Sequence, residues 1–380
     1  MKRGLIIGKF LPFHEGHRHL IDSARAQVDE VHVLVCSLQR EMIPGEQRFA
    51  WIRDHYADDP GVRVYHNPDE NPQEPHEDPN FWRIWNASIR RFFAPNSTTP
   101  LPDILFSSES YGDELARVLG LRHAIVDPAR STVPISGTAV RKAPYHERRY
   151  LPEVTRAYFM KRIVITGPES CGKTTLASQL AEHYGTRWCH EYAREYLEER
   201  GIPVDDLESA HIPEIARGQA ALEDRLCAQT ARENGGVLFL DTDLIVTQIY
   251  AGHYFGHCPE WIRAEGLRRA ARYDLQILLT PETPWVADEL RNLQEQRDEM
   301  FEIFQRELQN AGAVFRVLPL PPDDTPGNKN DSLKRRFALR FEQAVRIVDE
   351  VLSTPARAKQ DTSRIPGTNQ NASAGEDAAR

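Results

Sequence analysis

The stretch Arg162–Thr174, with the sequence RIVITGPESCGKT, decides the fold of the second half of this chain. It places a G-x-x-x-x-G-K-[ST] motif directly between an apolar strand pattern and the helical pattern Gly172–His183. In such a loop the glycines let backbone N–H groups converge on a phosphate, and the helix N-terminus adds positive potential. Because the motif and its flanking elements both fit, we interpret Gly167–Thr174 as a phosphate-binding loop (P-loop) rather than a plain Gly-rich turn.

Apolar runs alternate with helical patterns on both sides of this loop, which indicates an α/β chain with parallel sheets covered by helices. The alternation restarts once, at Arg162, after the charged segment Lys142–Phe159. We therefore predict two doubly wound parallel-sheet domains, over residues 1–150 and 160–352. The Pro-rich segment Asn67–Pro79 is expected to be a long loop. The predicted strands are Gly4–Ile7, Val31–Ser37, Val62–Tyr65, Ile104–Ser108, Ala124–Val126, Arg162–Thr166, Arg187–Cys189, Val237–Leu240, Leu275–Leu279 and Val314–Leu318.

Composition excludes several classes of protein. The 380 residues include 47 Lys and Arg against 56 Asp and Glu, so the formal net charge is −9, which argues against a general nucleic-acid-binding protein. No apolar run approaches the roughly 18 residues that cross a membrane, so we expect a cytoplasmic protein. The 5 cysteines lack a Cys-x-x-Cys spacing, which predicts reduced thiols. Residues 353–380 hold a single large aliphatic side chain, Ile365, and are expected to be disordered.

Phosphoryl transfer needs a cation at the phosphates and a magnesium ligand. We expect Lys173 to bridge the outer phosphates of ATP. Thr174 is expected to ligate Mg²⁺ together with Asp241, which follows the strand Val237–Leu240. The predicted ATP-binding residues of the loop are Gly167, Glu169, Ser170, Cys171, Gly172, Lys173, Thr174 and Thr175.

The acceptor side is predicted after the strand Arg187–Cys189, which we expect to lie next to the P-loop strand. Glu191 is expected to align or deprotonate an acceptor hydroxyl, and Tyr192 and Arg194 to bind the substrate. Asp241 and Asp243 compete for the role of Glu191, and Asp243 is also a candidate substrate-binding residue. The sequence does not decide between them.

A pair of arginines further along the chain resembles a lid. Arg291 and Arg297 are six residues apart between two predicted strands. They are expected to close on the phosphates of ATP. A solvated surface position is the alternative for both.

A second phosphate-binding pattern follows the first strand, where residues 8–17 have the sequence GKFLPFHEGH and enter a helix. His14 and His17 are three apart and should share one face of the first helical turn, at its positive end. There they suit hydrogen bonding to a polyphosphate whose charge grows during transfer. Their spacing does not fit a His-Glu-x-x-His zinc site. The predicted ATP-binding residues of this loop are Gly8, Lys9, Phe10, His14 and His17.

The segment Ile135–Arg141, ISGTAVR, complements that loop near the end of the same predicted domain. Ser136, Thr138 and Arg141 place two hydroxyls and a guanidinium at a second helix start, which suits ATP phosphates. Ser136 alone would be interpreted as a helix cap.

The two patterns of the first half, G-x-F-x-P-x-H-x-G-H and I-S-x-T-x-x-R, resemble those of the nucleotidylyltransferase superfamily of Rossmann-like adenylyltransferases. Joined to a P-loop kinase, they resemble the bifunctional NadR family, nicotinamide mononucleotide (NMN) adenylyltransferase plus ribosylnicotinamide kinase, over about Gly4 to Val351. Glu289 departs from the glycine expected in the lid. Regulatory members begin with a helix-turn-helix domain, whereas this chain starts at its first strand, so we expect an enzyme without the repressor arm. Further matches are Pro44–Arg48, Ser108–Gly112, His190–Glu195, Asp241–Asp243 and Pro284–Asp288.

The resemblance implies two reactions, with Mg²⁺ as cofactor. The kinase half would phosphorylate nicotinamide riboside with ATP to give NMN, and the first half would join NMN to the adenylyl group of a second ATP, giving NAD and pyrophosphate. Arg48 is implied as a substrate-binding residue. Trp82 and Trp85 are candidates to stack on nicotinamide, and packing in the core is the alternative. No nucleic acid or membrane is implied as a partner, and a homo-oligomer is compatible with the sequence. The implied catalytic residues are His14, His17, Lys173, Glu191 and Asp241.

Two other classes stay open at this point. A coenzyme A pathway fusion, phosphopantetheine adenylyltransferase plus dephospho-CoA kinase, has the same two folds in the same order but would lack the run His190–Glu195. A regulatory protein that senses NAD or ATP would keep binding with negligible turnover. It would need a segment for DNA or a protein partner, and we find none in the sequence.

Overall fold

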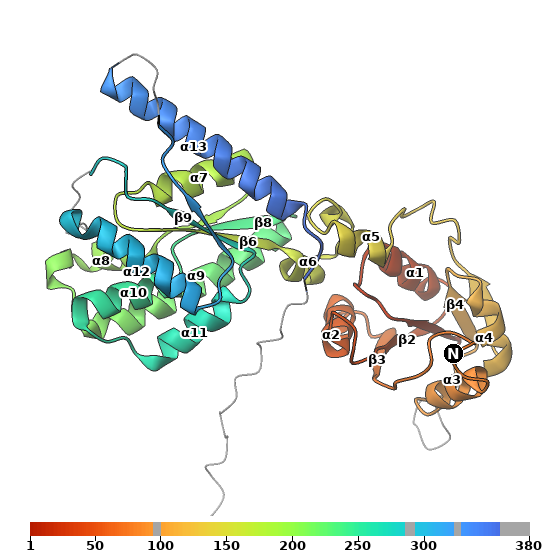
Figure 1. Ribbon diagram of the computed structural model, residues 1–380. Helices are drawn as coiled ribbons and strands as arrows, with labels where there is room; N and C mark the ends of the chain where they lie inside the picture. The colour runs from red at the N-terminus through yellow and green to blue at the C-terminus, as the bar shows by residue number, and fades with distance from the viewer. Residues whose placement is uncertain (94–99, 286–292, 323–327, 358–380) are drawn as a thin grey trace, which may run out of the picture.

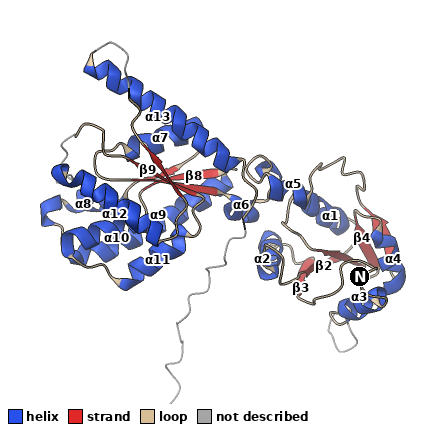
Figure 2. Cartoon of the chain, in the orientation of Figure 1, coloured by secondary structure: helices blue, strands red, loops and turns tan. Residues whose placement is uncertain are grey.

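Two five-stranded parallel sheets form the frame of the molecule, one in each half of the chain (Figure 1). The computed structural model describes residues 1–93, 100–285, 293–322 and 328–357. Helices cover both faces of the second sheet (Figure 2). The predicted α/β fold with two doubly wound parallel sheets is therefore confirmed.

The sheet of the first half contains strands that bury both faces. Its strands are β1 (Arg3–Gly8), β2 (Glu30–Cys36), β3 (Val62–Asn67), β4 (Ile104–Ser107) and β5 (Arg122–Ile125), in the order β3-β2-β1-β4-β5. Its helices are α1 (Glu15–Arg25), α2 (Gly45–His55), α3 (Phe81–Arg90), α4 (Tyr111–Leu119) and α5 (Gly137–Lys142). Alternate residues of a strand face opposite sides of a sheet. Ile6 accordingly packs with residues of α1 and α2, and Leu5 packs with residues of α3 and α4.

The sheet of the second half places the P-loop strand at its centre. Its strands are β6 (Lys161–Thr166), β7 (Trp188–Cys189), β8 (Val237–Asp241), β9 (Leu275–Leu279) and β10 (Phe315–Leu318), in the order β10-β9-β6-β8-β7. Its helices are α7 (Lys173–His183), α8 (Tyr192–Arg200), α9 (Ile212–Arg232), α10 (Leu244–Phe255), α11 (Glu260–Ala270), α12 (Arg297–Asn310) and α13 (Lys329–Leu352). Ile163 packs with residues of α7 and α13, and Val164 packs with residues of α9, α10 and α12.

One topological expectation is wrong. Strand β7 does not lie next to the P-loop strand, because β8 pairs with β6 on one side and with β7 on the other. A strand-helix-strand connection in a parallel sheet can skip a position, and local sequence does not specify which position it takes. Glu191, which follows β7, therefore reaches the P-loop across the end of β8.

The predicted strands are all present, with ends that differ by at most two residues. Helix α12 begins at Arg297, after a 3₁₀ turn at Gln294–Gln296, and so starts later than the pattern Asn292–Asn310 indicates. Helix α2 escaped prediction because Trp51 and Ile52 are the only large apolar residues that it buries.

The segment between the two sheets is helical. Helix α6 (Glu153–Phe159) contacts α2 on one side and α9 on the other. The predicted domain boundary between residues 150 and 160 therefore stays a prediction. The chain also returns to the first half after α13, where the Ala356 N–H donates to the Arg141 carbonyl at 2.8 Å. The predicted disordered tail thus begins with residues that make contacts, and its residues 358–380 lie outside the described part.

Two further expectations concern the environment of the chain. No helix among the described residues has the length and the apolar character needed to cross a membrane. All of the cysteines are free thiols, as the sequence predicts.

Candidate functional site

The P-loop joins β6 to α7 at the carboxyl edge of the second sheet. Gly167 and Gly172 have φ values of 141° and 88°, which L side chains rarely adopt. The Lys173 Nζ donates to the Pro168 carbonyl at 2.9 Å, so the ammonium lies over the loop. Burial alone would lower the pKa of Lys173, but the Cys171 thiol and nearby carboxyl groups raise it above its usual value. The lysine is therefore positively charged at neutral pH, as an interaction with a phosphate requires.

Thr174 and Asp241 meet beside this loop. The Thr174 Oγ1 donates to the Asp241 Oδ2 at 2.5 Å, and Oδ1 has no hydrogen-bond partner among the described residues. Burial, followed by the charge of Glu191, raises the pKa of Asp241 to about 6. A buried carboxylate of this kind gains strongly from a cation, and a hydroxyl with a carboxylate oxygen is a donor set that Mg²⁺ accepts alongside phosphate oxygens.

Asp243 lies behind the site rather than in it. Thr242 has a φ of 73°, so the chain turns sharply between the two aspartates. The Asp243 Oδ1 accepts from the Val246 N–H at 3.1 Å and caps α10. Burial raises its pKa to about 7. Asp243 does not line the pocket that contains Lys173 and Glu191, so the structure does not bring it together with the predicted substrate-binding residues Glu191 and Arg194.

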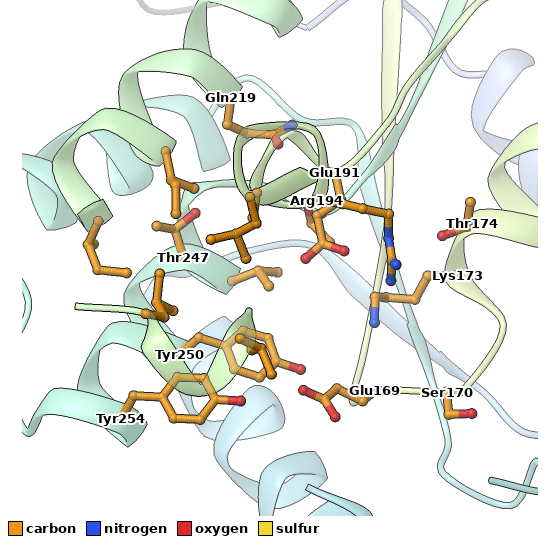
Figure 3. Close-up of a pocket in the computed structure, with 18 of the residues that line it drawn as sticks. Glu169, Ser170, Lys173, Thr174, Glu191, Arg194, Gln219, Thr247, Tyr250 and Tyr254 are labelled. Carbon is orange, nitrogen blue, oxygen red and sulfur yellow. The ribbon is translucent and has the colours of Figure 1, made fainter. Parts of the chain in front are cut away.

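The acceptor side is a pocket of about 170 Å³ between the P-loop, α8, α9 and α10 (Figure 3). Glu191 occupies the N-cap position of α8, but its side chain makes no capping hydrogen bond and lines the pocket with Arg194. Tyr192 is placed differently. Its ring lies against Gly218 and its N–H donates to Gln219 at 2.8 Å, so it supports α8 against α9.

Sequence analysis missed the far wall of this pocket. Tyr250 and Tyr254 extend from α10 towards Glu169, and their ring centroids are 6.0 Å apart at an interplanar angle of 19°. Gln219 of α9 and Thr247 also line the pocket. The sequence did offer a signal for this wall. Tyr250 and Tyr254 are four residues apart, so both should lie on one face of the helix that Asp243 caps.

The lid arginines are only partly described. Arg291 lies outside the described residues, as do Asp288 and Glu289. Arg297 is buried beside the P-loop, where Nη1 donates to the Thr283 carbonyl at 2.8 Å and Nη2 to the Ser170 carbonyl at 3.5 Å. In this arrangement its guanidinium supports the loop from outside and does not line the pocket that contains Lys173 and Glu191.

In the first half, the structure brings His14 and His17 together. Their rings stack with centroids 3.7 Å apart, and both line a cavity of about 570 Å³. His14 is not in the first turn of α1 but is its N-cap, where Nδ1 accepts from the Gly16 and His17 N–H groups at 3.1 and 3.4 Å. Burial, then the Arg130 charge, lowers the pKa of His14 to about 4, and burial also lowers that of His17. Both rings are therefore neutral at pH 7.

His14→Asn is expected to flatten the pH dependence of stability. The folded-state pKa of His14, about 4, is below its ordinary value of 6.5, so acid protonates the unfolded chain first. The free energy of unfolding should then fall by about 2 kcal/mol between pH 7.5 and 5, through this one group. Asparagine keeps an acceptor for the cap but cannot titrate. Urea unfolding of both proteins at the two pH values measures the effect, and equal pH slopes would contradict it.

Ser136, Thr138 and Arg141, the second predicted phosphate-binding group of the first half, line the same cavity as the two histidines. Ser136 caps the short helix α5 by accepting from the Ala139 N–H at 3.2 Å. The Arg141 guanidinium donates to the Leu11 carbonyl and, at 3.2 Å, to the Thr138 hydroxyl. These bonds tie α5 to the loop before α1. The predicted ATP-binding residues brought together on this cavity are Gly8, Lys9, Phe10, His14, His17, Ser136, Thr138 and Arg141.

Arg48 is fully buried behind the loop. It donates to the Lys9 carbonyl and to the Glu41 carboxylate, both at 2.6 Å, and Glu41 is also 3.1 Å from the Lys9 Nζ. Burial would raise the pKa of Glu41, but the Leu38 N–H and these two cations lower it. Arg48 does not line the histidine cavity or the neighbouring tryptophan cavity, whereas Lys9, whose carbonyl it holds, lines both.

A second cavity of the first half, of about 580 Å³, contains Trp82 and Trp85 in its wall. The Trp85 Nε1 donates to the Pro72 carbonyl at 2.8 Å, which fixes the Pro-rich loop against α3. This cavity and the histidine cavity adjoin each other, because the same side chains line both. The shared residues are Gly8, Lys9, Glu109 and Tyr111, of which the last two were not predicted as site residues.

Comparison with known proteins gives matches in both halves. Residues 5–143 match the cytidylyltransferase-like family model, and residues 162–324 match the AAA domain model. The chain is 32% identical over 306 residues to the trifunctional NAD biosynthesis/regulator protein NadR of Escherichia coli, a match that covers 76% of this chain and 72% of that protein.

Two solved structures are similar over nearly the whole chain, each at 26% sequence identity. A NadR protein in complex with NR superposes with a TM-score of 0.74 and coverage of 92% of this chain and 96% of that one. A NadR protein in complex with NAD and AMP-PNP gives a TM-score of 0.72, with coverage of 94% and 97%.

Proposed function

The chain belongs to the NadR family, and we propose that its two halves carry out consecutive steps of NAD synthesis. The P-loop half is a ribosylnicotinamide kinase, which transfers the γ-phosphoryl group of ATP to the 5′-hydroxyl of nicotinamide riboside and gives NMN. The first half is an NMN adenylyltransferase, in which the NMN phosphate attacks the α-phosphorus of ATP and gives NAD and pyrophosphate. Relatives and solved structures named for NAD biosynthesis, NR, NAD and AMP-PNP support both activities.

One observation carries this assignment: each half has a phosphate cradle that adjoins an acceptor cavity. In the first half, Lys9 and Tyr111 line both cavities. In the second half, Lys173 and Thr174 of the P-loop line the same pocket as Glu191 and Arg194. Direct transfer between two bound substrates requires such adjoining sites, because the attacking oxygen must lie within a few ångströms of the phosphorus.

In the kinase half, Lys173 neutralises the outer phosphates and Arg194 extends positive charge to the transferred group. Thr174 and Asp241 would hold Mg²⁺, and the unpartnered Asp241 Oδ1 fits that ion. The metal supplies charge neutralisation of the phosphates when bound. Glu191 aligns the acceptor hydroxyl and takes its proton.

In the adenylyltransferase half, the neutral rings of His14 and His17 donate hydrogen bonds to the triphosphate. Since Nδ1 of His14 serves the helix cap, Nε2 is the atom left for the nucleotide. Arg141, Ser136 and Thr138 stabilise the charge that develops on the leaving pyrophosphate. Trp82 and Trp85 offer apolar surface for the nicotinamide ring. A cytoplasmic location, where ATP is available, stays a prediction.

The decisive experiment incubates the purified protein with nicotinamide riboside and MgATP and follows NMN and NAD by chromatography. Appearance of NMN followed by NAD is the expected result. Turnover of phosphopantetheine and dephospho-CoA instead would favour the coenzyme A fusion. Tight nucleotide binding with negligible turnover would favour a sensor.

Glu191→Gln is expected to lower the kcat of riboside phosphorylation about 10²-fold, with little change in the KM for ATP. The amide keeps the size of the side chain and loses the proton acceptor. Glu182→Gln is the control, because Glu182 is an exposed carboxylate of α7 that does not line the pocket of Glu191 and should leave kcat unchanged. A rise in the KM for riboside at unchanged kcat would instead assign the acceptor role to Asp241.

A further inference from the structure

The backbone of the P-loop is held from outside by side chains that come from distant parts of the sequence. The Thr283 Oγ1 donates to the Ser170 carbonyl at 2.5 Å. The Arg340 Nη2 donates to the next carbonyl, that of Cys171, at 2.9 Å. Thr283 follows β9 and Arg340 belongs to α13, so the two contacts reach the loop from different elements.

These contacts fix the direction of the N–H groups that a phosphate needs. In a trans peptide the carbonyl and the following N–H point in opposite directions. A Cys171 carbonyl held on the outside therefore directs the Gly172 N–H towards the inside of the loop. Gly172 is also the N-cap residue of α7, so this N–H lies at the positive end of a helix.

Arg340 is built into this position. Its side chain is only 2% exposed, and its guanidinium carbon lies 5.1 Å from the centroid of the Phe337 ring. A Cβ at Gly172 would come within 2.7 Å of its Nη2, so the glycine is needed for the close approach as well as for its φ.

The positive charge of Arg340 is not paired with a carboxylate in the described part of the chain. Its partner is the backbone carbonyl of Cys171 rather than a carboxylate, and Nη1 has no hydrogen-bond partner among the described residues. Burial lowers the pKa of Arg340, which Glu282 partly opposes, yet a guanidinium stays protonated at neutral pH. A buried cation directly behind the P-loop is stabilised when the triphosphate occupies the front.

We propose that Arg340 is a positioning residue for the nucleotide of the kinase half, which holds the Cys171 carbonyl so that the Gly172 N–H faces the phosphates and adds positive potential behind them. The proposal rests on the proposed kinase activity. It assigns a role to a helix at the far end of the chain, 169 residues from the carbonyl that it holds.

The test compares three variants of the full chain in riboside phosphorylation at saturating riboside. Arg340→Met should raise the KM for MgATP about tenfold with a kcat within threefold of wild type, because it weakens ground-state and transition-state binding alike. Arg340→Lys keeps the charge and one donor and should raise the KM only two- to fourfold. Arg336→Met is the matched control, since Arg336 lies one turn earlier in α13 and donates to the Pro321 carbonyl at 2.6 Å instead of to the loop.

A second readout separates the proposal from the proposed function. Titration calorimetry with Mg–AMP-PNP measures nucleotide binding without turnover, and the heat that is lost in a Lys173→Ala protein identifies binding at the P-loop. Arg340→Met should weaken it about tenfold even if the riboside is not the acceptor. Unchanged affinity and KM in Arg340→Met, or an equal loss in Arg336→Met, would overturn the proposal. If Arg340→Met does not fold, the Arg340→Lys protein is the test. A wild-type KM and a wild-type affinity in that protein would overturn the proposal.

Discussion

Lys173→Ala should abolish the formation of NMN from nicotinamide riboside, a loss of about 10³-fold or more, and leave the conversion of NMN to NAD nearly unchanged. The lysine lies over the P-loop, with its ammonium 2.9 Å from the Pro168 carbonyl, and is the cation placed to bridge the outer phosphates. The N-terminal cradle has its own residues on a different sheet, so it does not use this charge.

Both rates can be measured in one preparation by supplying either riboside or NMN with MgATP. The adenylylation rate then serves as the internal control for folding, and a thermal melt of the variant checks the P-loop half. Equal loss of both activities would contradict the division of the reactions between two separate sites.

His17→Ala should reduce adenylyl transfer to NMN by about 10²-fold or more, with little change in melting temperature. Its Nδ1 is buried without a hydrogen-bond partner among the described residues, while its ring stacks on His14 in the wall of the nucleotide cavity. Removal of a donor that acts on the developing charge lowers kcat, whereas removal of a packing group would lower stability.

The matched control is His183→Ala, which removes an exposed histidine of the other half. It should leave adenylylation unchanged. Riboside phosphorylation in the His17→Ala protein should also stay at the wild-type rate. A His17→Ala protein that melts early, or one that adenylylates NMN at the normal rate, would assign the ring to core packing.

Local motifs predicted a large part of the candidate sites. The P-loop pattern requires glycine where φ is 141° and 88°, and the strand before it and the helix after it are both set by local apolar periodicity. The same holds for the loop that carries His14 and His17. Because the carboxyl ends of parallel strands share one edge of a sheet, Asp241 could also be placed near Thr174 from sequence alone.

The order of the strands was not available from the sequence. Strand β8 separates β7 from the P-loop strand, yet Glu191 still lines the pocket because α8 begins there. Likewise, the direction of Asp243 depends on the positive φ of Thr242, which turns the second aspartate into a helix cap.

Tertiary structure alone decided which charged side chains face a ligand and which support the loops behind it. Arg48, Arg297 and Arg340 are all buried and donate to backbone carbonyls of phosphate-binding loops or of their neighbours. Sequence spacing indicates which residues share a turn or a strand end. It does not indicate that Arg340 of α13 is buried against the P-loop, because that contact depends on elements far away in the chain.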